Sequence, residues 1–128
     1  MSHPRKQVER PYCGSRWTRA RFFAFIRTAL RKASVKWPPR IDVKVAARRK
    51  VQTPGRSKQQ KWEFVCAQCG GWFPDKEVEV DHIVPCGKLA SFEDIGPFCQ
   101  RLFCEADGLR VICKKCHIEH TNSLTSCQ

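Results

Sequence analysis

The chain has 128 residues, enough for one small domain with an extension and too few for several independent cores. Hydrophobic residues make up 41% of it, and no apolar run approaches the length that crosses a bilayer. The net charge is +12. Because the first residues lack the apolar core of a secretory signal, we expect a cytoplasmic protein with no membrane contact.

The positive charge is concentrated in the first half of the chain. Residues 1–61 contain 18 Lys and Arg against two acids, a net charge of +16, whereas residues 62–128 contain six basic and ten acidic residues, a net charge of −4. This asymmetry is typical of a basic arm that binds nucleic acid beside a separate compact domain. A solubilising arm is the alternative, since charged runs are often only solvated surface. We therefore expect a basic, largely helical DNA-binding arm and linker over 1–61, and a compact domain over 62–128.

The basic half contains two expected helices. After a lead-in over 1–15, apolar residues recur at three- and four-residue steps across Arg16–Ala33. The segment Trp37-Pro38-Pro39 should end this helix, because the residue before a proline is pushed out of helical geometry. A second basic helix is expected over Ile41–Val51, and the Pro-Gly and polar run over 54–61 predicts a linker.

Short strands and helices follow one another in the second half, which predicts the α+β class. Trp62–Val65 is aromatic and partly β-branched, as in a strand. Alternation over 77–82 predicts a half-buried strand, with Val and His side chains on one face and acidic side chains on the other. A helix is expected over 95–104, a strand-like approach over 109–112 and a terminal helix over 116–124.

Nine cysteines in a reducing compartment are more often metal ligands or free thiols than disulfides. Cys66 and Cys69 form one Cys-x-x-Cys pair, and Cys113 and Cys116 form another. Two such turns can complete the tetrahedral four-thiolate shell of a structural Zn²⁺ site. A redox pair is the alternative, but a thioredoxin-like motif occurs once within a βαβ pattern, which is missing here. The other cysteines are expected to be buried or surface thiols: Cys13, Cys86, Cys99, Cys104 and Cys127.

Polar residues suited to metal and proton chemistry lie beside the cysteine pairs. Asp81 and His82 fall within the 43 residues between the pairs, and His117 directly follows Cys116. A carboxylate and an imidazole can bind a divalent ion, and a neutral imidazole near pH 7 can deprotonate water. Taken singly, such residues are more often an ordinary strand-to-turn pair or a helix-surface histidine. His120 is open between a metal ligand, a phosphate contact and plain surface.

The segment Val-Asp-His-Ile-Val-Pro at 80–85, flanked by Cys-x-x-Cys and followed by Leu-Arg-Val-Ile-Cys-Lys-Lys-Cys-His at 109–117, resembles the HNH endonuclease family. The resemblance covers about residues 62–124 and is closest to small, zinc-stapled, phage-encoded members, for which the location would be the host cytoplasm. It implies a ββα-metal fold, with Asp81 and His82 on a β-hairpin and His117 on the helix. It further implies that Asp81 and His117 hold a catalytic Mg²⁺ or another divalent ion, while His82 is the general base.

The sequence departs from the family pattern at Gly108, where the family has Asn, and Asp107 is the nearest substitute. Strand neighbours point to opposite faces, so Asp81 and His82 can share a site only if the strand is distorted near Pro85. We expect a metal-dependent DNA endonuclease that hydrolyses phosphodiester bonds. The alternative is a non-catalytic, zinc-dependent DNA-binding module derived from an HNH fold, and a third possibility is action on RNA.

Overall fold

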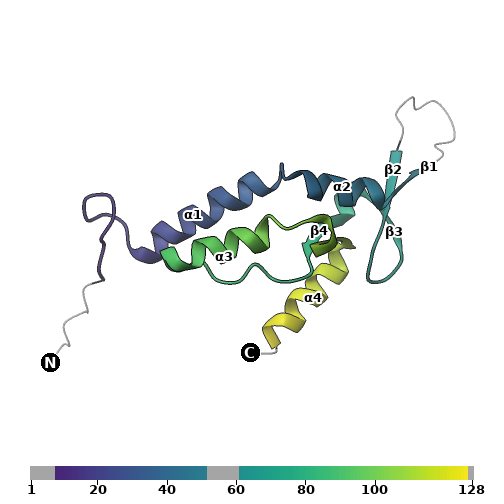
Figure 1. The fold of residues 1–128 in the computed structure, drawn as a ribbon. Coiled ribbons are helices and arrows are strands. Elements are labelled where there is room, and N and C mark those ends of the chain that lie inside the picture. Colours follow the sequence, from purple (N-terminus) through teal and green to yellow (C-terminus); the bar gives the residue numbers. More distant parts are fainter. Residues whose placement is uncertain (1–7, 52–60, 127–128) are drawn as a thin grey trace. The chain divides into compact units, whose positions relative to one another are not determined.

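The computed structural model describes residues 8–51 and 61–126, and its elements are four α-helices and five short strands (Figure 1). The chain divides into two compact units, Met1–Val35 with Cys86–Phe103 and Lys36–Pro85 with Cys104–Gln128. This division cuts across the expected boundary between residues 61 and 62, because part of the basic half packs into the cysteine-containing unit. None of the described helices is long and apolar enough to span a membrane.

The first unit contains α1 (Arg19–Ser34) and α3 (Phe92–Leu102), close to the helices expected there. α1 begins at Thr18, whose hydroxyl accepts a hydrogen bond from the backbone N–H of Arg21 at 3.2 Å. Near the start of α3, the N–H of Ala90 donates to the Asp94 carboxylate and thereby lowers its pKa. The core of this unit consists of buried residues from both helices and from the segment just before α3: Phe23, Cys86, Leu89, Phe98 and Leu102.

The second unit begins with α2 (Pro38–Ala46). Its first residue is a proline, at a position where a missing N–H loses no helical hydrogen bond. The segment Trp37-Pro38-Pro39 thus follows the end of one helix, as expected, and also starts the next. The expectation that this helix runs to Val51 is wrong, because Arg48–Val51 form strand β1. Antiparallel pairing with Lys61–Val65 outweighs the local helical pattern.

Three strands of this unit form an antiparallel sheet in the order β1-β2-β3. β2 (Lys61–Val65) is the strand expected at Trp62–Val65, and β3 (Trp72–Pro74) follows the first cysteine pair. The linker expected over 54–61 lies outside the described residues apart from Lys61, which begins β2. β1 therefore lies at one edge of the sheet.

A second, two-stranded sheet pairs β4 (Val78–His82) with β5 (Leu109–Cys113) in antiparallel register. Helix α4 (Lys114–Ser126), yellow in Figure 1, follows β5 without a loop and packs against both strands. It begins two residues before the expected start at Cys116, and these three elements position every candidate site residue outside the first cysteine pair.

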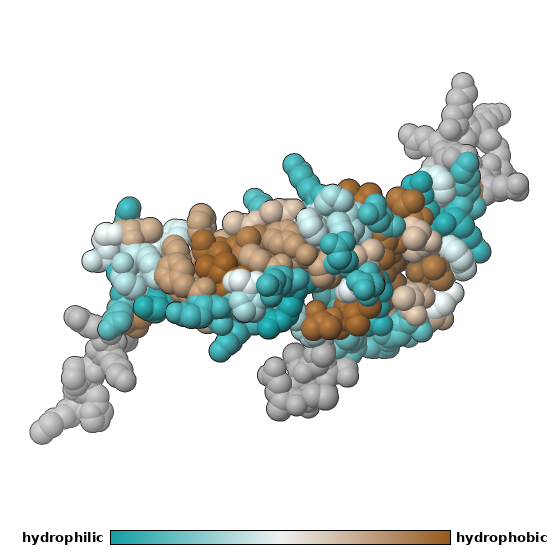
Figure 2. Space-filling model, in the orientation of Figure 1, coloured by the Kyte–Doolittle hydropathy of each residue, from teal (hydrophilic) through white to brown (hydrophobic). Residues whose placement is uncertain are grey.

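Two small apolar clusters hold the second unit together. Phe64, Val78 and Val111 join β2 to the β4–β5 hairpin, and Ile112 packs among the cysteine side chains. Large apolar side chains also remain exposed, and apolar and hydrophilic groups lie next to each other on the surface in Figure 2. Cores of this size supply limited stability, so a metal ion held by the cysteines would be a natural supplement.

Candidate functional site

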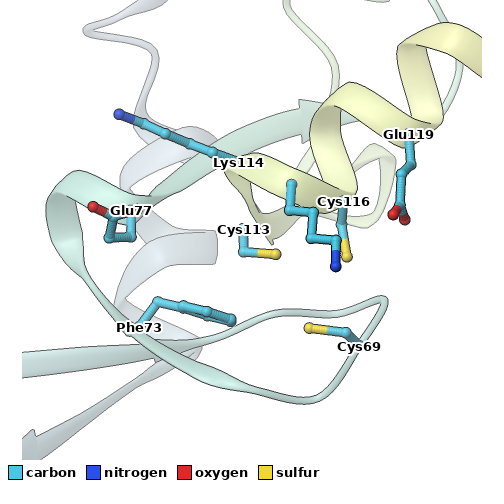
Figure 3. A pocket seen from close by; sticks show the side chains of 8 residues that line it. Cys69, Phe73, Glu77, Cys113, Lys114, Cys116 and Glu119 are labelled. Atoms are coloured by element: carbon cyan, nitrogen blue, oxygen red, sulfur yellow. The ribbon is translucent and has the colours of Figure 1, made fainter.

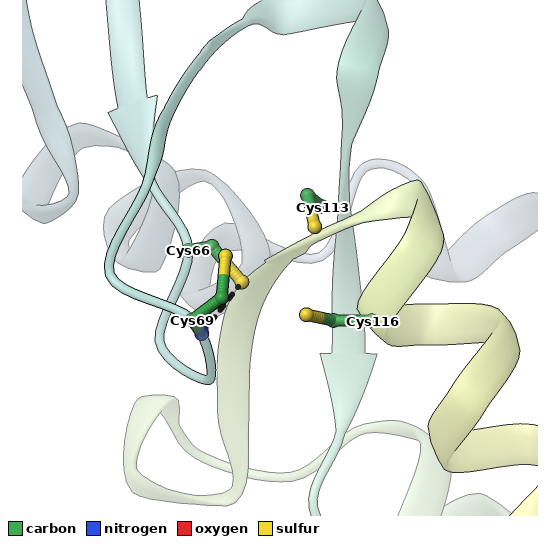
Figure 4. Close-up of side chains that lie close together, drawn as sticks. All are labelled: Cys66, Cys69, Cys113 and Cys116. Atoms are coloured by element: carbon green, nitrogen blue, oxygen red, sulfur yellow. Dashed lines mark hydrogen bonds between the residues drawn. The ribbon is translucent and has the colours of Figure 1, made fainter.

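The side chains of four cysteines converge in the second unit. The sulfur atoms of Cys66, Cys69, Cys113 and Cys116 all lie within 4.8 Å of one another (Figure 4). Cys69 is exposed and the other three are buried. The expected grouping of the two pairs is confirmed, and the cluster could hold a metal ion. Among the residues the structure describes, no other set of three or more Cys, His, Asp or Glu ligand atoms meets this criterion.

Local backbone geometry forms the first half of this cluster. Gly70 has a φ of 75°, a left-handed conformation that glycine adopts without strain. Its N–H donates to the carbonyl of Cys66 at 2.9 Å, and the N–H of Cys66 donates to the carbonyl of Gly71 at 2.8 Å. The N–H of Ala67 then donates to the carbonyl of Val111 at 2.8 Å, which fixes this turn against β5.

The thiols influence one another strongly. Burial raises the pKa of Cys66, but backbone N–H groups including those of Cys69 and Cys113 outweigh it and lower that pKa to about 6. The N–H of Cys69 lies 3.4 Å from the Cys66 sulfur, along the dashed line in Figure 4. Burial and the neighbouring thiols raise the pKa of Cys116 to about 12. Four thiolates at this separation therefore require a cation to coexist.

A cavity of about 360 Å³ lies beside the cysteines (Figure 3). Its lining combines cysteine sulfur atoms with the ring of Phe73 and the side chains of Lys114 and Glu119. Because three of the four cluster cysteines line it, this cavity belongs to the candidate metal site.

The other cysteines lie apart from the cluster. Cys86 is buried in the core of the first unit, Cys99 and Cys104 are partly buried, and Cys13 is exposed. This agrees with the expectation of buried or surface thiols, and Cys127 lies outside the described residues.

A carboxylate and two imidazole rings form a second cluster in the same unit. Asp81 on β4 is only 6% exposed, and its Oδ2 accepts a hydrogen bond from Arg110 Nε at 3.1 Å. His117 Nε2 lies 3.6 Å from Asp81 Oδ1, and His120 Nε2 lies 3.7 Å from Asp81 Oδ2. The structure thus brings Asp81 and His117 together and adds His120. Asp81 lies on the acidic face of its strand, as the alternation predicts, and it is buried there because α4 packs against β4.

Glu79 lies at the edge of this cluster. It is two residues before Asp81 and so points to the same face of β4. Its Oε2 is 2.9 Å from His117 Nδ1. Neither Glu79 nor Arg110 is among the site residues predicted from the sequence. The spacing of the acidic residues was a signal for Glu79, whereas Arg110 is found only through the register Asp81↔Arg110.

His82 follows Asp81, and strand alternation directs its side chain to the other face of β4. β4 and β5 pair regularly through His82↔Leu109, so the register gives no sign of the distortion that a shared site requires. His82 is the last residue of the strand, where the chain turns toward Pro85. Its role as general base stays a prediction.

Gly108 lies at the end of a short 3₁₀ turn, Ala106–Gly108. Its carbonyl accepts a hydrogen bond from Ile83 N–H at 3.0 Å and so links the end of β4 to the start of β5. A Cβ atom at Gly108 would lie 2.9 Å from the Cys104 sulfur, so an asparagine side chain would require this cysteine to move. Asp107 is exposed beside it.

Comparisons with protein-family models, curated proteins and solved structures gave no significant match. The fold and the site define a mixed α+β protein in which four clustered cysteines could hold a metal ion. Any more specific function has to be argued from the residues of this chain.

Proposed function

We propose that the chain is a metal-dependent DNA endonuclease of the HNH type, with a structural Zn²⁺ held by the four cysteines. The observation that carries the proposal is the buried Asp81 carboxylate, which faces Nε2 of His117 and of His120 at 3.6 and 3.7 Å. β4 pairs with β5, and α4 follows β5 directly; this pairing is compatible with the ββα arrangement that the resemblance implies, although α3 lies between β4 and β5 in the chain. The basic charge of the first half of the chain fits a DNA partner.

The second cluster offers donor types that bind divalent cations, although its atoms do not meet the criterion that the cysteine sulfur atoms meet. If His117 Nδ1–H donates to Glu79, Nε2 of the neutral ring is an acceptor that faces a carboxylate oxygen. His120 Nε2 is buried and has no hydrogen-bond partner among the described residues. Where the imidazole nitrogens present lone pairs to the carboxylate, a cation between them is favourable; Arg110 already donates to Asp81 Oδ2, so the cation would share this carboxylate with Arg110. Carboxylate and imidazole ligands suit Mg²⁺, Mn²⁺, Zn²⁺ or Ni²⁺.

The residues around this cluster have separate roles in the proposed reaction. Asp81 and His117 would hold the divalent ion, with His120 within reach as a further ligand. When bound, such an ion polarises the scissile phosphate and stabilises the leaving oxygen. Arg110 fixes the Asp81 carboxylate, and Glu79 fixes the tautomer of His117. The resemblance gives His82 the role of taking the proton of the attacking water, which yields 5′-phosphate and 3′-hydroxyl products; this role requires the His82 side chain, which strand alternation directs to the other face of β4, to reach the cluster.

The proposed Zn²⁺ has a structural role. Four cysteine ligands fill a tetrahedral shell and leave no position for water or substrate. Successive helical residues differ by about 100° around the axis. Cys116 can therefore belong to the zinc site while His117, the next residue of α4, faces Asp81. The zinc would thus determine where the imidazole ligands lie.

A plasmid-nicking assay with Mg²⁺, Mn²⁺, Ni²⁺ or Zn²⁺ tests this function. We expect the wild type to convert supercoiled DNA to nicked or linear forms. His82→Ala should abolish turnover and leave DNA affinity nearly unchanged. No cleavage with any of these metals refutes the endonuclease, and full activity of His82→Ala refutes the base assignment.

The second candidate is a non-catalytic, zinc-dependent DNA-binding module. Gly108 favours it, since this position has no side chain and the Cys104 sulfur occupies the adjacent space. This alternative predicts salt-sensitive binding with no cleavage under any metal condition. Parallel assays with deoxyribose and ribose substrates would show whether RNA is the target instead.

A further inference from the structure

Strand β1 places three consecutive cations at one edge of the three-stranded sheet. Arg48, Arg49 and Lys50 are all exposed. Because side chains alternate along a strand, Arg48 and Lys50 share one face and Arg49 points to the other. The register agrees, since Lys50 lies opposite Trp62 and Arg49 lies opposite Glu63.

A tryptophan ring lies beneath the cations on each face. Arg48 Cζ is 4.0 Å from the ring centroid of Trp62, and Lys50 Nζ is 5.8 Å from the same centroid. On the other face, Arg49 Cζ is 3.9 Å from the ring centroid of Trp72. Such contacts hold flexible cations in place and leave N–H donors available for an anion.

The two faces differ in how their charge is compensated. Arg49 donates to Glu63 Oε1 through Nε at 3.3 Å and Nη2 at 3.1 Å. Within 8–51 and 61–126, neither Arg48 nor Lys50 forms an ion pair with a carboxylate. An incoming anion would therefore break no ion pair at Arg48 and Lys50, whereas it would compete with Glu63 for Arg49.

Arg48 and Lys50 belong to the same unit as the Asp81 cluster. Phe64, opposite Arg48 on β2, is buried against Val78 of β4 and Val111 of β5. Val78 lies three residues before Asp81 on the same strand. A polyanion held at β1 would thus contact the unit that carries the proposed catalytic residues.

We infer that Arg48 and Lys50, supported by Trp62, form a surface that binds the phosphate backbone of duplex DNA. The inference rests on the proposed function for the identity of the polyanion, and it adds the surface that holds it. Two uncompensated cations over an aromatic ring suit a chain of phosphates, and such contacts position a duplex without reading its bases. The competing explanation is that charges on an edge strand only prevent edge-to-edge pairing between molecules.

The test is a binding titration of the zinc-loaded full chain with a short, labelled duplex, without added divalent metal, at several salt concentrations. For Arg48→Gln/Lys50→Gln we expect about tenfold weaker binding near 0.1 M salt, and a slope of log K against log salt reduced by about 1.8. Arg48→Gln alone should weaken binding about threefold.

The matched control is Arg49→Gln, which removes one charge from the same strand and should leave affinity within about twofold of wild type. Arg48→Lys/Lys50→Arg keeps both charges and should bind the duplex as the wild type does. Circular dichroism checks that each variant is folded.

Three results would refute the inference that Arg48 and Lys50 bind DNA: a wild type that does not bind the duplex, a double variant with unchanged affinity, or equal losses of affinity for Arg48→Gln and Arg49→Gln. A double variant that self-associates in sedimentation while its monomer binds DNA normally would support edge protection instead. Cleavage is measured separately on plasmid. A chain that nicks DNA without needing Arg48 and Lys50 overturns only the surface, and one that binds through them but never cleaves overturns only the endonuclease.

Discussion

The second unit contains two polar clusters that are built differently. The cysteine cluster draws four identical ligands from two short segments, and its sulfur atoms lie within 4.8 Å of one another. The cluster around Asp81 combines a strand carboxylate with two helix imidazoles at 3.6 and 3.7 Å, and in it His120 Nε2 is buried with no hydrogen-bond partner within the described part of the chain. Four cysteines can fill every position of a tetrahedral metal shell, as in a structural site. The Asp81 cluster offers fewer protein ligands and would leave positions for water or substrate, as a reactive site needs.

The two clusters meet in α4, because Cys116 belongs to one and His117 to the other. We therefore expect the Asp81 cluster to depend on the cysteine cluster, and the cysteine cluster to form without the Asp81 cluster. Loss of the cysteine cluster should release α4 and so disrupt both clusters. Loss of the Asp81 cluster should leave the cysteines in place, and variants of each cluster can test this order.

The largest effect is expected from Cys113→Ser. This change removes one ligand of the proposed zinc, whose binding in small zinc domains is worth about 10–16 kcal/mol. We expect the purified variant to lose its zinc and the cooperative unfolding of the second unit, as measured by metal analysis and thermal circular dichroism. Cys13→Ser, at an exposed thiol in the other unit, is the control and should change neither quantity. A variant with full zinc content and unchanged melting would contradict the structural role.

The next effect in size is expected from Asp81→Asn. The amide cannot balance the charge of Arg110 or bind a cation as a carboxylate does, so unfolding free energy should fall by about 2 kcal/mol. Mn²⁺ affinity, measured by calorimetry, and plasmid cleavage should each fall by about 100-fold or more. Zinc content should stay at one ion per chain. Asp42→Asn, at an exposed carboxylate of the same unit, serves as the matched control and should behave like wild type. Joint loss of zinc in Asp81→Asn would contradict the independence of the cysteine cluster.

These clusters also differ in how far the sequence alone could predict them. Cys-x-x-Cys spacing is local, so one tight turn brings each pair together whatever the rest of the fold does. The link between Asp81 and His117 came from the family resemblance. The contacts of Arg110 and Glu79 depend on strand register and on the start of α4 at Lys114, which no local pattern determines.

Strand β1 gives a similar lesson for the fold. The residues over Ile41–Val51 have a helical pattern, and the first part of this segment is indeed helical. Arg48–Val51 become a strand only because a partner strand lies across the hairpin, and a pairing of this kind carries no local signal. The strands at Trp62–Val65 and 78–82 were predictable because their aromatic content or alternation is itself local.

A smaller effect is expected from Glu79→Gln. If the Glu79 carboxylate accepts a hydrogen bond from His117 Nδ1–H, it keeps the lone pair on Nε2, where a metal ion could bind. We expect Mn²⁺ affinity to fall about tenfold, with a shift of the His117 ring nitrogens toward the other tautomer in ¹⁵N NMR spectra. Glu77→Gln is the control on the same segment and should leave the ring signals unchanged. Unaltered tautomer and affinity in Glu79→Gln would show that Glu79 is only a neighbour of the ring.

The smallest effect, and the one that separates the two clusters most sharply, is expected from His120→Leu. A buried nitrogen without a hydrogen-bond partner destabilises a folded protein by about 1–3 kcal/mol, so an apolar residue of similar size should raise unfolding free energy by about 1 kcal/mol in the absence of divalent metal. Added Mn²⁺ should stabilise the wild type more than the variant, because the wild type keeps one more ligand. Denaturant unfolding with and without Mn²⁺ measures both differences. A structural histidine predicts a variant that is less stable under both conditions, whereas a metal ligand predicts that the gain in stability disappears or reverses once Mn²⁺ is present.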